Sequence, residues 1–172
     1  MESTLNPYSD ALLAILRGLL DQVIEAMDGM PEEDLATWRT PLAHGEVSTM
    51  YGLAVHIAGA GEHWTLEAAG ARASQFNRLK DFTARGSIAE ISARYDDWMT
   101  ELEAMLREIS DEELRALYVR KENRSRGVGA TSVPKASANL LALSHTALHV
   151  GHMQVQRQLW GEEQAQRSAN AR

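Results

Sequence analysis

Four long stretches of the chain repeat apolar residues at intervals of three and four, which is the period of an amphipathic helix. Helices of this kind bury their apolar stripes against one another, so the sequence predicts an all-α fold, a four-helix bundle. No strand-like alternation of useful length and no internal repeat is found. The predicted helices are Pro7–Met27, a second from about Val47 to Ala69, a third from Ser87 to Ile109, and a fourth from Ser132 or Pro134 to Trp160.

The link between the second and third helices sets their relative direction. It has about 17 residues, which is too long for a tight hairpin. We therefore expect a long crossover that makes these two helices parallel neighbours. Ser87, with Glu90 three residues later, forms the capping-box pattern of a helix start.

A length of 172 residues suits one domain with a hydrophobic core. We expect residues 1–161 to form this single domain, with Gly161 ending the fourth helix and residues 162–172 forming a flexible C-terminal tail. The segment Val119–Gly129 is predicted to be an exposed loop. Its basic run from Arg120 to Arg126 could attract an anionic substrate, although such runs are usually only solvated.

The overall charge makes nucleic acid and membrane poor partners, because a formal net charge of -7 repels phosphate backbones and anionic lipid headgroups. The polar segment Met1–Asp10 lacks the pattern of a signal peptide, so we expect a cytoplasmic protein. The chain has no cysteine, so a metal site must use nitrogen and oxygen ligands.

Three of the six histidines lie close together in the fourth predicted helix. His145 and His149 are four residues apart, so they stack on one helix face and can bind one metal ion. Both share a stripe that we expect to face inward, and His56 lies on the inward stripe of the second helix. A buried histidine bound only to a carbonyl or hydroxyl is the alternative. The inward stripe of the fourth helix is predicted to contain Leu141, Leu148, Val155 and Leu159.

The other histidines have weaker claims to a role. His152 could line a pocket or carry a proton, or be a partly exposed polar residue. His63 is two turns beyond His56, about 10.5 Å along the axis, so we expect it at the pocket rim or on the surface. His44 is expected on the surface. Small residues around His56, including three mid-helix glycines, imply a cavity or the close approach of a backbone or ligand.

The sequence resembles the DinB/YfiT-like superfamily of small bacterial four-helix metalloproteins. The similarity rests on His56 with Trp64 eight residues later and on the pattern His145-x-x-x-His149-x-Gly151, and it extends over nearly the whole chain. It implies that His56, His145 and His149 bind a divalent metal. Members often have Arg-Gly-Gln after the second histidine of that pattern and an acidic residue five after the first ligand, where this chain has Val150 to His152 and Gly61.

The resemblance also implies a class of activity. Three imidazoles leave a coordination position open for water or substrate, as catalytic metal sites do. Better understood members of the superfamily activate a low-molecular-weight thiol such as bacillithiol or mycothiol. We therefore expect a metal-dependent thiol S-transferase that acts on a small-molecule substrate, with a thiol cosubstrate. A metal-dependent hydrolase and a non-catalytic, stress-associated metal-binding protein are the alternatives.

Two further expectations concern the metal and the assembly. Imidazole ligands suit zinc, nickel and iron, and the sequence does not choose among them. We also expect a homodimer, because the apolar residues of the first helix exceed one inward stripe and leave a patch to cover. Those residues are Leu5, Leu12, Leu13, Ile15, Leu16, Leu19 and Leu20.

Overall fold

The computed structural model describes residues 5–40, 48–70, 76–120 and 131–171 and confirms the predicted all-α bundle. Its long elements are α1 (Pro7–Met27), α3 (Met50–Glu62), α5 (Ile88–Glu108) and α7 (Lys135–Asn170), and a π-helical segment, η2 (His63–Ala69), continues α3. Among the described residues, no helix is long and apolar enough to cross a lipid bilayer.

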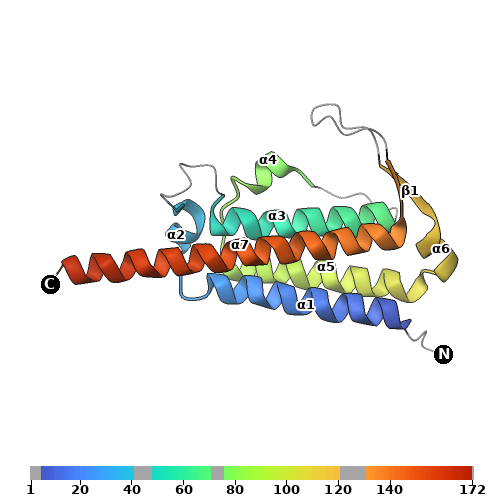
Figure 1. Ribbon diagram of the computed structural model, residues 1–172, viewed down its shortest axis with the longest axis horizontal. Helices are drawn as coiled ribbons and strands as arrows, with labels where there is room; N and C mark the ends of the chain where they lie inside the picture. Colours follow the sequence, from blue (N-terminus) through green and yellow to red (C-terminus); the bar gives the residue numbers. More distant parts are fainter. Residues whose placement is uncertain (1–4, 41–47, 71–75, 121–130, 172) are drawn as a thin grey trace.

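The four long helices form a ring in which α1 contacts α7, α7 contacts α3, α3 contacts α5, and α5 contacts α1. Figure 1 shows α3 and α5 running in one direction and α1 and α7 in the other. The expected crossover between parallel neighbours is therefore confirmed. It contains the short helix α4 (Arg78–Asp81), which packs on α3.

Local signals at the helix ends agree with the sequence. The Ser87 side chain accepts from the Glu90 backbone N–H, and the Glu90 carboxylate accepts from the Ser87 backbone N–H, so the capping box is present.

Inside the ring, Leu16 of α1, Ile57 of α3 and Leu102 of α5 are completely buried. Helix α2 (Glu32–Thr37) occupies part of the connector between α1 and α3.

Close packing of α3 against α5 depends on Gly61. A Cβ placed on Gly61 would lie 2.0 Å from the nearest Trp98 ring atom, so only glycine leaves room for the indole. The Trp98 Nε1–H donates to Thr65 Oγ1 at 2.8 Å, and the Thr65 hydroxyl donates to the Gly61 carbonyl at 2.8 Å. The mid-helix glycine therefore serves the close approach of a neighbouring side chain.

The predicted end of the fourth helix is wrong. Helix α7 does not end before Gly161 but continues to Asn170, and Figure 1 shows this end projecting beyond the bundle. A single glycine costs a helix only about 1 kcal/mol. Side-chain bonds to the α2 region stabilise the extension, because Trp160 donates to Asp34 and Trp38 donates to Glu163, each at 2.8 Å.

A small antiparallel hairpin was also missed. Strands β1 (Leu117–Arg120) and β2 (Thr131–Pro134) pair with Leu117 opposite Pro134, so Val119 and Arg120 belong to a strand rather than to the predicted loop. Strands of four residues are too short for alternation to identify them. Together with α6 (Asp111–Arg115), the hairpin connects α5 to α7.

The inward face of α7 also differs from the prediction. Leu141, Leu148 and Val155 are 41%, 57% and 55% exposed, so the stripe that we assigned to the core faces outward. The buried stripe carries mostly small or polar side chains, and it packs against α1 and α3. Its buried residues are Ala138, Asn139, Ala142, Thr146, Val150, Met153 and Gln156.

The contrast between two helical glycines gives a stability prediction. We expect Gly61→Ala to lower the free energy of unfolding by about 1–3 kcal/mol, because the added methyl group overlaps the Trp98 ring. Gly18→Ala is the matched control, since a Cβ at Gly18 meets no atom within 4 Å, and it should raise stability by about 0.5–1 kcal/mol. Chemical denaturation followed by circular dichroism measures both, and equal gains in the two variants would contradict this packing.

Candidate metal centre

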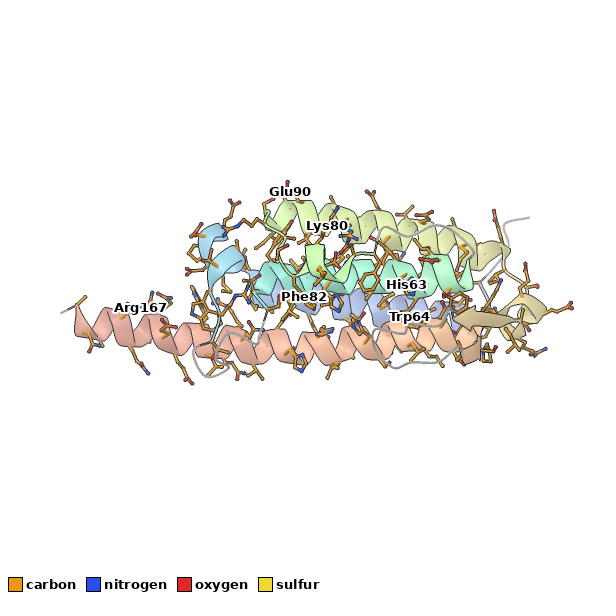
Figure 2. All side chains as sticks on the ribbon, turned by 90° about the horizontal axis from the view of Figure 1, so that it is seen from above. His63, Trp64, Lys80, Phe82, Glu90 and Arg167 are labelled. Carbon is orange, nitrogen blue, oxygen red and sulfur yellow. The ribbon has the colours of Figure 1, made fainter. Side chains whose placement is uncertain are left out.

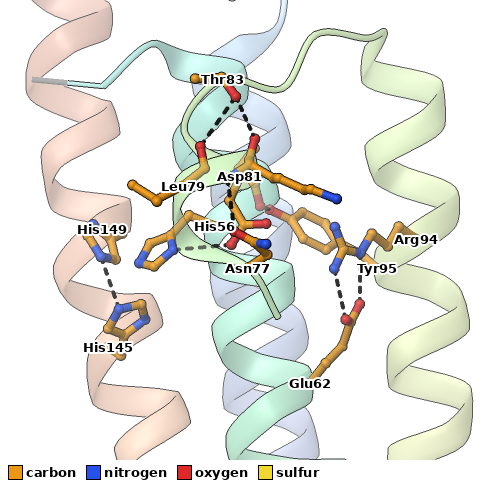
Figure 3. Close-up of polar contacts among 12 residues, drawn as sticks. His56, Glu62, Asn77, Leu79, Asp81, Thr83, Arg94, Tyr95, His145 and His149 are labelled. Carbon is orange, nitrogen blue, oxygen red and sulfur yellow. Dashed lines mark hydrogen bonds and ion pairs between the residues drawn. The ribbon is translucent and has the colours of Figure 1, made fainter. Parts of the chain in front are cut away.

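Three histidines from two antiparallel helices converge on one point. One ring nitrogen from each of His56, His145 and His149 can be chosen so that the three atoms lie within 4.8 Å of one another. The His56 ring centroid lies 5.0 Å from that of His145 and 5.2 Å from that of His149. Figure 3 shows His56 reaching from α3 toward the two histidines of α7.

The spacing of these nitrogens fits a divalent ion. The Nε2 atoms of His145 and His149 are 3.1 Å apart. Two nitrogens that bind one zinc ion at about 2.0–2.1 Å with tetrahedral angles lie about 3.3 Å apart, so this pair already has a suitable separation. The donor set consists of imidazoles, which suit zinc, nickel and iron.

The surroundings of His56 hold its ring in place. His56 is 4% exposed, and the rings of Phe82 and Phe76 lie 4.5 Å and 5.7 Å from its own, measured between centroids. His145 and His149 are half-buried at the edge of the α7 stripe. One of the three candidate ligands is therefore fixed in the core, and the other two lie nearer to solvent.

Asp81 is a site residue that the sequence did not reveal. Its Oδ2 lies 3.6 Å from His56 Nδ1, on the side of the ring away from the α7 histidines (Figure 3), and the residue is 7% exposed. Gly59 provides the space, because a Cβ there would lie 3.1 Å from the same oxygen. Burial raises the pKa of the Asp81 carboxyl, and the Arg94 charge opposes that rise.

This arrangement suits a ligand orienter. A histidine that binds metal through one ring nitrogen commonly presents the other to a carboxylate, which fixes the ring and raises its basicity. Asp81 occupies that position behind His56. Because Asp81 lies in the short helix α4, no periodic pattern in the sequence marks it.

The remaining histidines separate into two groups. His152 is exposed, and its Nδ1 lies 3.4 Å from His149 Nδ1, so it borders the cluster. His63 lies outside the cluster, with its Nδ1 2.9 Å from Glu67 Oε2, and Figure 2 labels it nearer to the hairpin end of the bundle than Phe82. His44 and residues 121–126 of the basic loop lie outside the described residues.

A cavity of about 660 Å³ adjoins the cluster. Residues from α3, the crossover and α7 line it, including Leu53, Phe82, His149 and His152. A second cavity of about 560 Å³ involves α1 and α5 residues, and its lining includes no histidine of the described part of the chain. A small molecule can therefore lie beside His149, where an open metal position would be needed.

The fold and the three-histidine cluster define the class, a DinB/YfiT-like helical bundle. Residues 11–161 match the family model described as Mycothiol-S-transferase. The chain belongs to this DinB/YfiT-like family, which confirms the resemblance inferred from the sequence and implies a thiol S-transferase. A search of curated proteins gave no significant match.

The position of Asp81 yields a prediction for metal affinity. We expect Asp81→Asn to weaken zinc binding about 10- to 100-fold, because the isosteric amide loses the charge that orients His56. Competition with a chromophoric chelator measures the dissociation constant. Asp97→Asn, which removes an exposed charge on α5, is the control and should leave it unchanged. Unaltered affinity in Asp81→Asn, with the apo fold intact by circular dichroism, would exclude this role.

Proposed function

We propose that the chain is a metal-dependent thiol S-transferase in which His56, His145 and His149 hold one divalent ion. The observation that carries the proposal is the convergence of three imidazoles at the edge of a cavity that can admit a small molecule. Membership of the mycothiol S-transferase family supports a thiol, rather than water, as the nucleophile. A reduced thiol also favours a reducing compartment such as the cytoplasm.

The proposed reaction transfers the thiol sulfur to an electrophilic carbon of the acceptor. A bound divalent ion supplies Lewis acidity, which lowers the pKa of a thiol so that the thiolate exists near neutral pH. The S–H bond breaks, a new S–C bond forms to the electrophilic carbon of the acceptor, and the leaving group departs with its electron pair. His152, exposed beside His149, is placed to accept the thiol proton and pass it to solvent.

The three histidines differ in their surroundings. His56 is held by the core and by Asp81, whereas His145 and His149 face the more open side. The apolar residues that line the cavity would limit the access of water to one side of the reacting pair, which favours transfer over hydrolysis. A hydrolase would need the same imidazoles but no thiol, and a metal-holding protein would need no cavity.

An assay with separate components tests the function. We expect purified protein to accelerate conjugation of mycothiol to chlorodinitrobenzene when zinc, nickel or iron is present, and His149→Ala to lose most of that rate. His63→Ala is the matched control, because His63 lies outside the cluster and bonds to Glu67. Product formation without thiol would indicate the hydrolase, and stoichiometric metal without turnover would indicate the metal-holding protein.

The expected homodimer needs a different surface from the one predicted. Leu12, Leu13, Leu16 and Leu20 of α1 are buried within the chain, and Ile15 is 52% exposed, so α1 offers no broad patch. We propose that the outward face of α7 pairs with a second copy. No Asp, Glu, Lys or Arg occurs from Ala136 to Gln156, and charge depletion is typical of interface cores. The exposed apolar residues of this face that lie outside the cavity lining are Leu140, Leu141 and Leu148.

Light scattering tests this assembly. We expect the mass of two chains at micromolar concentration, and the mass of one chain for Leu148→Glu, because the new carboxylate would be buried in the interface. Ala165→Glu on the projecting end of α7 adds the same charge outside this face and should remain dimeric. A wild-type protein with the mass of a single chain would rule out the dimer.

A further inference from the structure

The cavity beside the histidine cluster has mostly apolar walls. They come from α3, from α4 and the chain after it, and from α7, and two of the wall residues, Leu79 and Val155, are 83% and 55% exposed. Exposed leucine and valine at the mouth of a cavity favour an apolar ligand. The apolar lining residues are Leu53, Leu79, Phe82, Val155 and Leu159.

Two of the neutral polar side chains that line this cavity, Gln156 and Ser48, hold polar atoms that are buried from water. Gln156 is 3% exposed, and neither its amide nitrogen nor its amide oxygen has a hydrogen-bond partner within the described part of the chain. The hydroxyl of Ser48 is likewise buried from water and has no hydrogen-bond partner among the described residues. A buried polar group without a partner costs about 1–3 kcal/mol, so its presence in a cavity wall calls for an explanation.

We propose that this cavity binds the electrophilic acceptor, an apolar molecule that carries a neutral carbonyl or amide group recognised by Gln156 and Ser48. The proposal rests on the proposed transferase function. The glutamine amide can donate to a carbonyl and accept from an N–H, and the serine hydroxyl can do either. Rotation about the glutamine side-chain torsions lets the amide turn toward the cavity that the residue lines.

The apolar walls favour the electrophilic acceptor over the thiol cosubstrate. A strongly polar thiol cosubstrate would have to desolvate its polar groups against leucine, valine and phenylalanine, which is costly. An apolar acceptor with one hydrogen-bonding group gains binding free energy from the apolar walls and from the polar side chains of Gln156 and Ser48. Arg39, the cation among the lining residues, is exposed, so solvent screens its charge and it favours a carboxylate only weakly.

Helix geometry also sets the length of the acceptor. Gln156 follows His149 by seven residues, which corresponds to about 10.5 Å along the helix axis. A molecule whose carbonyl meets Gln156 therefore extends about two helical turns before its reactive carbon reaches the metal ligands. His152 lies between these two points on α7 and borders the same cavity.

Binding of unreactive analogues tests the proposal without turnover. N-phenylsuccinimide carries two carbonyl groups, and N-phenylpyrrolidine has the same rings without them. We expect the full chain, free of thiol and treated with chelator, to bind the succinimide more tightly in calorimetric titration. Gln156→Leu should weaken succinimide binding roughly two- to tenfold, the worth of one hydrogen bond, and leave pyrrolidine binding unchanged.

Two further variants and a stability measurement test whether the effect of Gln156→Leu comes from damage to the fold. Gln154→Leu alters an exposed glutamine two residues away and should keep the succinimide preference, whereas Ser48→Ala should reduce it. Gln156→Leu should be at least as stable as the wild type in thermal denaturation, because it removes an unsatisfied buried amide. Marked destabilisation would show that the amide has a structural partner and would overturn the proposal.

The remaining outcomes separate this proposal from the transferase function. If the wild type binds neither analogue, or if Gln156→Leu keeps the full preference, the recognition role is wrong whether or not the enzyme conjugates thiols. Tighter binding of N-phenylglycine, which carries a carboxylate, would overturn it in favour of an acidic ligand at Arg39. A preference that depends on Gln156 in a protein without transferase activity would support the site while refuting the reaction.

Discussion

The structure depends on placing an imidazole inside an apolar bundle, because a buried polar ring is costly unless its surroundings compensate. Small residues on α3 make this possible. Gly59 gives Asp81 space to approach His56, and Gly61 gives Trp98 space to approach the same helix. Larger residues at these positions would separate α3 from its neighbours and remove the geometry on which the histidine cluster relies.

The bundle topology links this packing to the site. Since α3 and α5 are parallel, the chain must return along the length of the bundle, and it does so across α3. That crossover supplies Asp81 behind His56, Phe82 against its ring, and Leu79 at the mouth of the cavity. A short hairpin between antiparallel helices could supply none of them, so the long link serves both the fold and the site.

The sequence predicted the features that repeat or have fixed spacing. Helical periodicity predicted the bundle, the link length predicted the crossover, and the four-residue spacing of His145 and His149 predicted their proximity. Asp81 and Gln156 could not be predicted, because each depends on contacts between distant segments. The outward face of α7 was misassigned because Leu148 and Val155 are more apolar than Thr146 and Gln156, whereas most residues of the buried face are small or polar.

X-ray absorption spectroscopy of the zinc-loaded protein would test the central claim most directly, because it reports the identity and distance of the metal ligands without requiring activity. We predict one zinc per chain with three imidazole nitrogens at about 2.0–2.1 Å and one further oxygen ligand from water. A spectrum with one imidazole or none, or with a ligand set unchanged by His145→Ala, would contradict the three-histidine centre.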